Sequence, residues 1–115
     1  NNIKKISVEE VRRTAPDIIA NEVLKYLSSC DLIYISFDVD SLDCDLVSYG
    51  TGTPVMNGFT EQEASGVINH LLIDKRTCCL EVVEINPCLD NKQNKMAETA
   101  LRILDQATSI VEKRG

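Results

Sequence analysis

The chain has 115 residues, of which 43% are hydrophobic and 26% are charged, and its formal net charge is −6 at pH 7. These values are typical of one globular domain with a core of its own. No apolar run approaches the ~20 residues of a membrane-spanning helix, and the first residues lack the apolar segment of a secretory signal. An acidic chain without a basic stripe is not expected to bind nucleic acid.

The five cysteines are odd in number and form no CxxC pair: Cys30, Cys44, Cys78, Cys79 and Cys88. A disulfide framework or a zinc site is therefore not expected, and a reducing cytoplasm is the predicted location. We expect all five to be small buried hydrophobic residues.

The first third of the chain predicts two helices and a strand. Ser7 and Glu10 have the spacing of a capping box, which predicts a short helix. Pro16 suits a first helical turn, and apolar residues at helical spacing predict a helix over 16–28. The continuous apolar run 32–37 predicts a strand that is covered on both faces, as in parallel sheets.

Residues 38–59 predict a long loop, because aspartate, glycine, serine and asparagine recur throughout. A loop of about twenty residues is uncommon in a compact domain and is usually functional or disordered. This one directly follows an acidic strand end, which favours function.

The second half of the chain predicts helix, strand and helix. Thr60 and Glu63 form a second capping box, residues 77–85 predict a strand, and a long helix follows the loop 86–94. The expected inner face of that last helix is Ala97, Ala100, Leu101, Leu104, Ala107 and Val111. The whole order predicts a βαβ unit in an α/β fold, and two strands alone indicate a piece of a larger sheet.

Asp38 and Asp40 directly follow the first strand, and binding sites in α/β sheets lie beyond the carboxyl ends of strands. If strand geometry continues, both carboxylates point to one side. This arrangement suits a divalent ion with hard oxygen ligands, such as Mg²⁺ or Mn²⁺. The alternative role, capping turns, is preferred for Asp43 and Asp45.

Three other polar residues have predicted roles. Glu84 ends the second strand, so we expect its carboxylate at the same crevice, as a metal ligand or as a partner of a cationic substrate. Glu81, three residues earlier, is expected in a structural ion pair. The only histidine, His70, is expected to be structural or at the surface, near a helix end where a positive charge is favourable.

Four segments occur in order: SFDVDSLD, GTGTPV, GFTEQEA and EVVEINP. Together they resemble the ureohydrolase family, which includes arginases, agmatinases and formimidoylglutamases, and they resemble the arginase-like members most closely. The resemblance implies a three-layer α/β/α domain around a parallel sheet. Residues 1–115 would form a C-terminal portion of that domain, with the order helix, strand, helix, strand, helix.

The resemblance also implies a binuclear Mn²⁺ site. Asp38 matches the carboxylate that bridges both ions, and Asp40 matches a ligand of one of them. Glu84 matches the carboxylate that orients a guanidinium group, and Thr53 matches a residue close to that group. Two metal ions supply a hydroxide that attacks the guanidinium carbon and releases urea. L-Arginine is the expected substrate, and agmatine, formimidoylglutamate or another guanidino compound remain alternatives.

The histidines and further aspartates that the family uses as ligands have no counterpart in this chain. We therefore expect this portion alone to be inactive, and we expect it to associate through its open sheet edges. Two other functions stay open: a non-catalytic association module, and a phosphatase of the haloacid-dehalogenase type with Asp38 as nucleophile and Asp40 as acid and base. Leu42 departs from the phosphatase motif, which favours threonine or valine there.

Overall fold

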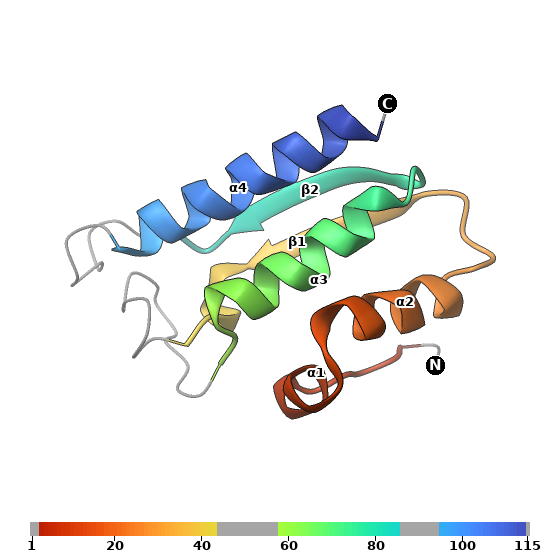
Figure 1. Cartoon of the computed structure of the whole chain (residues 1–115), viewed down its shortest axis with the longest axis horizontal. Coiled ribbons are helices and arrows are strands. Elements are labelled where there is room, and N and C mark those ends of the chain that lie inside the picture. The colour runs from red at the N-terminus through yellow and green to blue at the C-terminus, as the bar shows by residue number, and fades with distance from the viewer. Residues whose placement is uncertain (1–2, 44–57, 86–94, 115) are drawn as a thin grey trace.

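The computed structural model describes residues 3–43, 58–85 and 95–114. Figure 1 shows the elements in chain order, which are α1 (Val8–Thr14), α2 (Pro16–Tyr26), β1 (Ile33–Asp38), the 3₁₀ helix η1 (Val39–Ser41), α3 (Glu61–Ile73), β2 (Thr77–Val83) and α4 (Lys95–Lys113). The predicted helix, strand, helix, strand, helix order is confirmed. Within these ranges, no helix is both long and apolar enough to cross a membrane.

Both predicted capping boxes begin their helices. The Ser7 hydroxyl accepts a hydrogen bond from the Glu10 backbone N–H at 3.1 Å, and the Thr60 hydroxyl accepts from the Glu63 N–H at 3.1 Å. Each glutamate carboxylate accepts in return from the N–H of its capping residue. These side chains satisfy backbone donors that have no partner within the helix, so the sequence places both helix starts correctly.

The two strands are parallel neighbours, as predicted. Ile35 lies opposite Leu80, and Asp38 lies opposite Val83 at the carboxyl end of the sheet. The helix α3 connects the two strands and packs against α4 beside them. The result is one βαβ unit of the expected α/β class.

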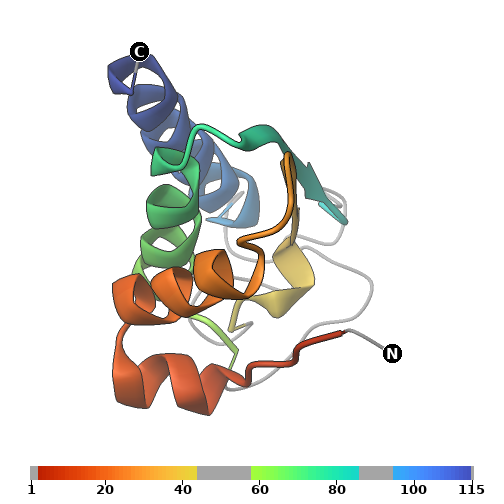
Figure 2. The same cartoon turned by 90° about the vertical axis from the view of Figure 1, so that its right-hand side faces the viewer.

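The helices gather on one face of this sheet, as Figure 2 shows. Ile33 and Phe37 point toward them and are buried, whereas Tyr34 and Ser36 lie on the opposite face and are exposed. The core between sheet and helices consists of Phe37, Val39, Leu42, Ala64, Ile68, Leu72, Met96, Ala100, Ile103 and Ala107. The described ranges thus form two of the three layers that the resemblance implies.

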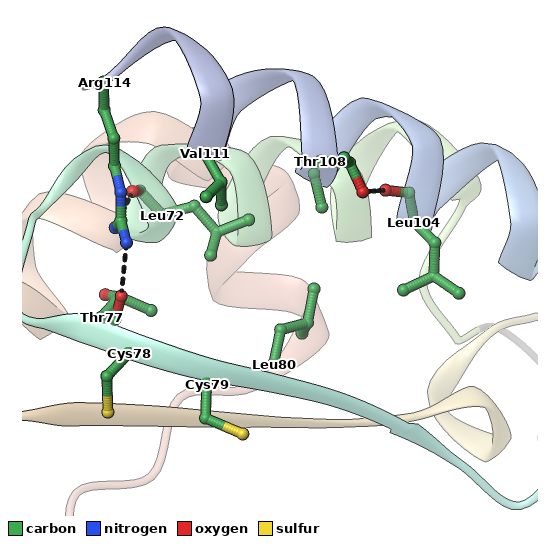
Figure 3. A pocket seen from close by; sticks show the side chains of 10 residues that line it. Leu72, Thr77, Cys78, Cys79, Leu80, Leu104, Thr108, Val111 and Arg114 are labelled. Atoms are coloured by element: carbon green, nitrogen blue, oxygen red, sulfur yellow. Dashed lines mark hydrogen bonds between the residues drawn. The ribbon is translucent and has the colours of Figure 1, made fainter.

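The prediction that the cysteines are buried is wrong for the three that the structure describes. Cys30, Cys78 and Cys79 are exposed and free. The register between the strands shifts at this point, so that Cys78 is an extra residue in β2. Figure 3 shows Cys78 and Cys79 on the side of β2 away from α4. A bulge of this kind puts two successive side chains on one face, which simple alternation cannot predict.

The predicted inner face of α4 is also partly wrong. Ala100 and Ala107 are buried as expected, but Leu101 is 66% exposed and Val111 is 42% exposed. The buried face is instead centred on Ile103, which has no exposed area. Leu104 and Val111 border a groove of about 270 Å³ between α4 and β2 (Figure 3).

Candidate functional site at the carboxyl end of the sheet

The register of the sheet brings Asp38 and Glu84 to the same edge. Asp38 is the last residue of β1 and lies opposite Val83, the last residue of β2. Glu84 follows Val83 directly, and both acidic residues are exposed. The carboxyl ends of parallel strands are where α/β folds place their ligands, so this edge is the candidate site.

Strand geometry does not continue beyond Asp38. The condition under which the carboxylates of Asp38 and Asp40 would point to one side is therefore not met. The chain turns at once into η1, which contains Val39, Asp40 and Ser41. Asp38 begins this turn: its Oδ1 accepts a hydrogen bond from the Asp40 N–H at 2.8 Å. Ser41 Oγ donates to the Asp38 carbonyl at 2.7 Å. The capping role and the site role of Asp38 are therefore compatible, because its second carboxylate oxygen is not used by the turn.

The backbone of Glu84 is in the left-handed region, with φ of 71°. This conformation costs a residue with a side chain ~1 kcal/mol or more, and glycine adopts it freely. A glutamate kept in such a conformation at the end of a strand is typical of functional positions. The strained backbone therefore supports the role that the sequence predicts for Glu84.

Beyond η1 the chain is joined to the start of α3. The Asp43 N–H donates to the Phe59 carbonyl, and the Phe59 N–H donates to the Ser41 carbonyl, both at 2.8 Å. Gly58 lies tightly against this pairing, because a Cβ atom there would be 2.4 Å from the Ser41 carbonyl oxygen. Thr53, the other predicted substrate residue, lies outside the described ranges.

The donor set explains what this edge can hold. Asp38 and Asp40 offer hard carboxylate oxygens, which fit Mn²⁺ or Mg²⁺ by chemistry. In the part of the chain that the structure describes, no group of three or more histidine, cysteine, aspartate or glutamate side chains could hold a metal ion. The chemistry of the two aspartates fits Mn²⁺ or Mg²⁺, but two carboxylates alone are fewer than such an ion requires.

Two other acidic and basic predictions have clear outcomes. His70 contacts the Asn21 side chain, with 2.8 Å between Nε2 and Oδ1, and so joins α3 to α2 in a structural role as predicted. The ion pair predicted for Glu81 is wrong, because its carboxylate accepts hydrogen bonds from the hydroxyls of Ser36, at 2.7 Å, and Tyr34. The hydroxyl partners of Glu81 lie on the neighbouring strand, so its position in the sequence could not predict them.

Comparison with known proteins shows which family the chain resembles. The model of the "Arginase family" matches residues 1–109. The arginase of Bacillus subtilis (strain 168) is 33% identical over 105 residues, which are 91% of this chain and 35% of that protein. The chain thus spans about a third of the length of the curated relatives it matches.

Solved structures agree as well. The crystal structure of Helicobacter pylori arginase superposes with a TM-score of 0.83 at 28% identity, over 92% of this chain and 34% of that one. A hypothetical agmatinase from Burkholderia thailandensis superposes with a TM-score of 0.79 at 20% identity, over 98% of this chain and 38% of that one, and so shares the fold. From the family match and these likenesses we conclude that the chain belongs to the arginase family.

Proposed function

We propose that residues 1–115 are the C-terminal portion of a manganese-dependent hydrolase of guanidino compounds, with L-arginine as substrate. The observation that carries the proposal is the meeting of Asp38 and Glu84 at the carboxyl edge of the sheet in a chain of the arginase family. Family membership favours this function over the phosphatase alternative. The likeness to an agmatinase fold keeps agmatine as the second candidate substrate.

In this proposal Asp38 and Asp40 hold Mn²⁺ through their carboxylate oxygens. Mn²⁺ held by these residues would supply hydroxide at neutral pH, which is the nucleophile that amidine hydrolysis requires. Glu84 accepts hydrogen bonds from the guanidinium N–H donors in a bidentate, charge-assisted pair and so orients the carbon to be attacked. Thr53, which lies outside the described ranges, is assigned to the same substrate group by the family resemblance alone. The products are urea and the amine, which is ornithine when the substrate is arginine.

The chain alone is not expected to be active, because two carboxylates make only part of a metal site. The remaining ligands would come from the portion of the family domain that these residues do not match. The exposed free thiols Cys30, Cys78 and Cys79 support a reducing compartment such as the cytoplasm.

A chimera tests the proposal directly. Residues 1–109 of this chain would replace the matching third of Bacillus subtilis arginase, and urea release from L-arginine would be measured with Mn²⁺ present. We expect activity in the chimera and a loss of about a hundredfold or more with Asp38→Asn, because a metal ligand is removed. Asp31→Asn, an exposed aspartate before β1, should leave urea release unchanged.

A folded chimera that releases no urea would contradict the proposal, and so would equal activity in the Asp38→Asn and Asp31→Asn variants. Folding would be checked by thermal melting, which separates a lost site from a lost structure. Replacing L-arginine by agmatine in the same assay shows whether residues 1–109 determine which guanidino compound is hydrolysed.

A further inference from the structure

An arginine far from the site is joined to it by a continuous chain of contacts. Arg12, on α1, donates from Nε to Glu63 Oε2 and from a terminal nitrogen to Glu63 Oε1, both at 2.8 Å. The same terminal nitrogen donates to the carbonyl of Gly58 at 3.0 Å. A single guanidinium group thus holds a side chain of α3 and the backbone that enters α3.

Glu63 is itself fixed, so the guanidinium group has a rigid partner. Its carboxylate accepts from the Thr60 N–H at 2.9 Å, and its own N–H donates to the Thr60 hydroxyl. The hydrogen bond from Arg12 is the main reason that the pKa of Glu63 falls to about 2, and the Thr60 N–H adds to it. Asp43 lies near enough to favour the charge of Arg12 as well. The pair is therefore fully ionised at neutral pH.

Gly58 contacts both Arg12 and the turn that contains Asp40 and follows Asp38. It lies against the Ser41 carbonyl with no room for a Cβ atom, and the next residue, Phe59, donates to that carbonyl at 2.8 Å. Ser41 Oγ then bonds the carbonyl of Asp38. Each step is a close contact between described residues, from the α1 helix to the turn that carries Asp38 and Asp40.

We propose that Arg12 is a positioning residue for the turn that presents Asp38 and Asp40. The role of those aspartates rests on the proposed function, but the series of contacts from Arg12 to the turn does not. The planar guanidinium group of arginine is required, because one side chain must donate to both carboxylate oxygens of Glu63 and to the carbonyl of Gly58. Lysine keeps the charge but cannot make this planar set of bonds. An exposed ion pair contributes little energy, so the effect lies in local geometry more than in global stability.

The test measures amide hydrogen exchange by NMR in Arg12→Met and Arg12→Lys. The reporters are the N–H groups of Asp40, Asp43 and Phe59, whose acceptors lie in the turn and its pairing. We expect their protection to fall about tenfold in both variants, because the pairing opens locally more often. The remaining backbone should keep its protection, and the melting temperature should change little.

The structure offers a matched control. Arg102, on α4, donates two hydrogen bonds to the carboxylate of Glu61, at 2.7 and 2.9 Å. Glu61 lies on α3, as Glu63 does, so this pair joins α3 to α4 instead of to α1. Arg102→Met should leave the three reporter amides unchanged. Equal loss of protection in Arg12→Met and Arg102→Met, or no loss at the reporters in Arg12→Met, would overturn the inference. If Arg12→Met fails to fold, Glu63→Gln weakens the same link and answers the question.

A second readout separates this inference from the proposed function. Free Mn²⁺ broadens the amide signals of residues close to where it binds. In the arginase chimera, we expect Arg12→Met to lower Mn²⁺ affinity about tenfold, while Arg102→Met does not. Loss of amide protection without any Mn²⁺ binding in the parent chimera would support the link and count against the metal site. Unchanged affinity and unchanged protection would overturn the link itself.

Discussion

The carboxylate of Glu81 stabilises the protonated hydroxyl of Tyr34. Its hydroxyl donates to Glu81 across the exposed face of the sheet, and this hydrogen bond raises the pKa of Tyr34 to about 12. The same contact, with Ser36, lowers the pKa of Glu81. The raised tyrosine pKa means that this contact stabilises the fold up to about pH 10 and that the stabilisation is lost as pH rises through about 12. The lowered pKa of Glu81 means that the stabilisation is also lost at low pH, where the carboxylate becomes protonated.

We therefore expect one of the three tyrosines to ionise late in an ultraviolet titration at 295 nm. In Glu81→Gln the late transition should move back toward about pH 10, the ordinary value for tyrosine. Tyr34→Phe should remove the late transition altogether. A late transition that persists in Tyr34→Phe would show that another tyrosine is responsible.

Single residues also show where sequence reasoning ends. Asp38, Asp40 and Glu84 could be predicted, because the carboxyl end of an apolar strand is a recognisable place. Arg12 could not, since it is 46 positions from Gly58 and nothing local distinguishes it from Arg13. Long-range partners become visible only when the fold brings distant segments together.

Among the elements, the end of α3 is held by one arginine, Arg114, which directly follows α4. Arg114 donates to the carbonyls of Leu72 at 2.7 Å and Asp74 at 2.9 Å. It also donates to the carbonyl of Thr77, at the start of β2, at 2.9 Å. The Arg114 guanidinium thus joins the end of α3 to the start of β2, and at Asp74 it adds to the hydrogen bond that the carbonyl accepts from the Thr77 N–H.

Arg114→Met should lower the free energy of unfolding by about 1–3 kcal/mol, because it removes a charged donor that three carbonyls share. Chemical denaturation measures the change. Arg13→Met, an exposed arginine on α1, is the control and should stay within about 0.5 kcal/mol of the parent. Similar losses in both variants would show that charge rather than carbonyl capping is responsible.

The elements were predictable where local chemistry decides. Capping boxes placed the starts of α1 and α3, because each is a set of bonds within four residues. The inner face of α4 was not predictable in full, since apolar residues lie on two neighbouring faces and only packing chooses between them. Ile103 is buried and Leu101 is exposed for this reason. The bulge at Cys78 likewise depends on pairing with β1.

At the scale of the whole molecule, no described helix covers one face of the sheet. Tyr34 is 58% exposed and Leu32 is 69% exposed, and the helices lie on the other side (Figure 2). Exposed apolar surface of this kind, together with open strand edges, favours association. We expect the isolated chain to form dimers or larger assemblies through this face.

Light scattering over a range of concentrations checks this expectation. Tyr34→Lys places a charge on the open face and should shift the chain toward monomer. Leu101→Lys changes an equally exposed apolar residue on α4 and should leave the assembly unchanged. A parent chain that stays monomeric at high concentration would contradict the expectation.

The two-stranded sheet also shows how much of the site could be predicted from the sequence. Two metal-binding candidates, Asp38 and Asp40, and two substrate-binding candidates, Glu84 and Thr53, were predicted, and Thr53 lies outside the described ranges. Within those ranges the structure brings no group of three possible metal ligands together. The chain spans about a third of the length of the curated relatives it matches, and ligands outside these residues cannot be predicted from them.

The left-handed backbone of Glu84 has a consequence for evolution. Glycine at this position would relieve the conformational cost, so selection for stability alone favours replacing the glutamate. A lineage that no longer needed the carboxylate would drift toward glycine and become more stable. Among related partial sequences, a glutamate retained here would therefore indicate that natural selection still acts on the chemistry of this edge.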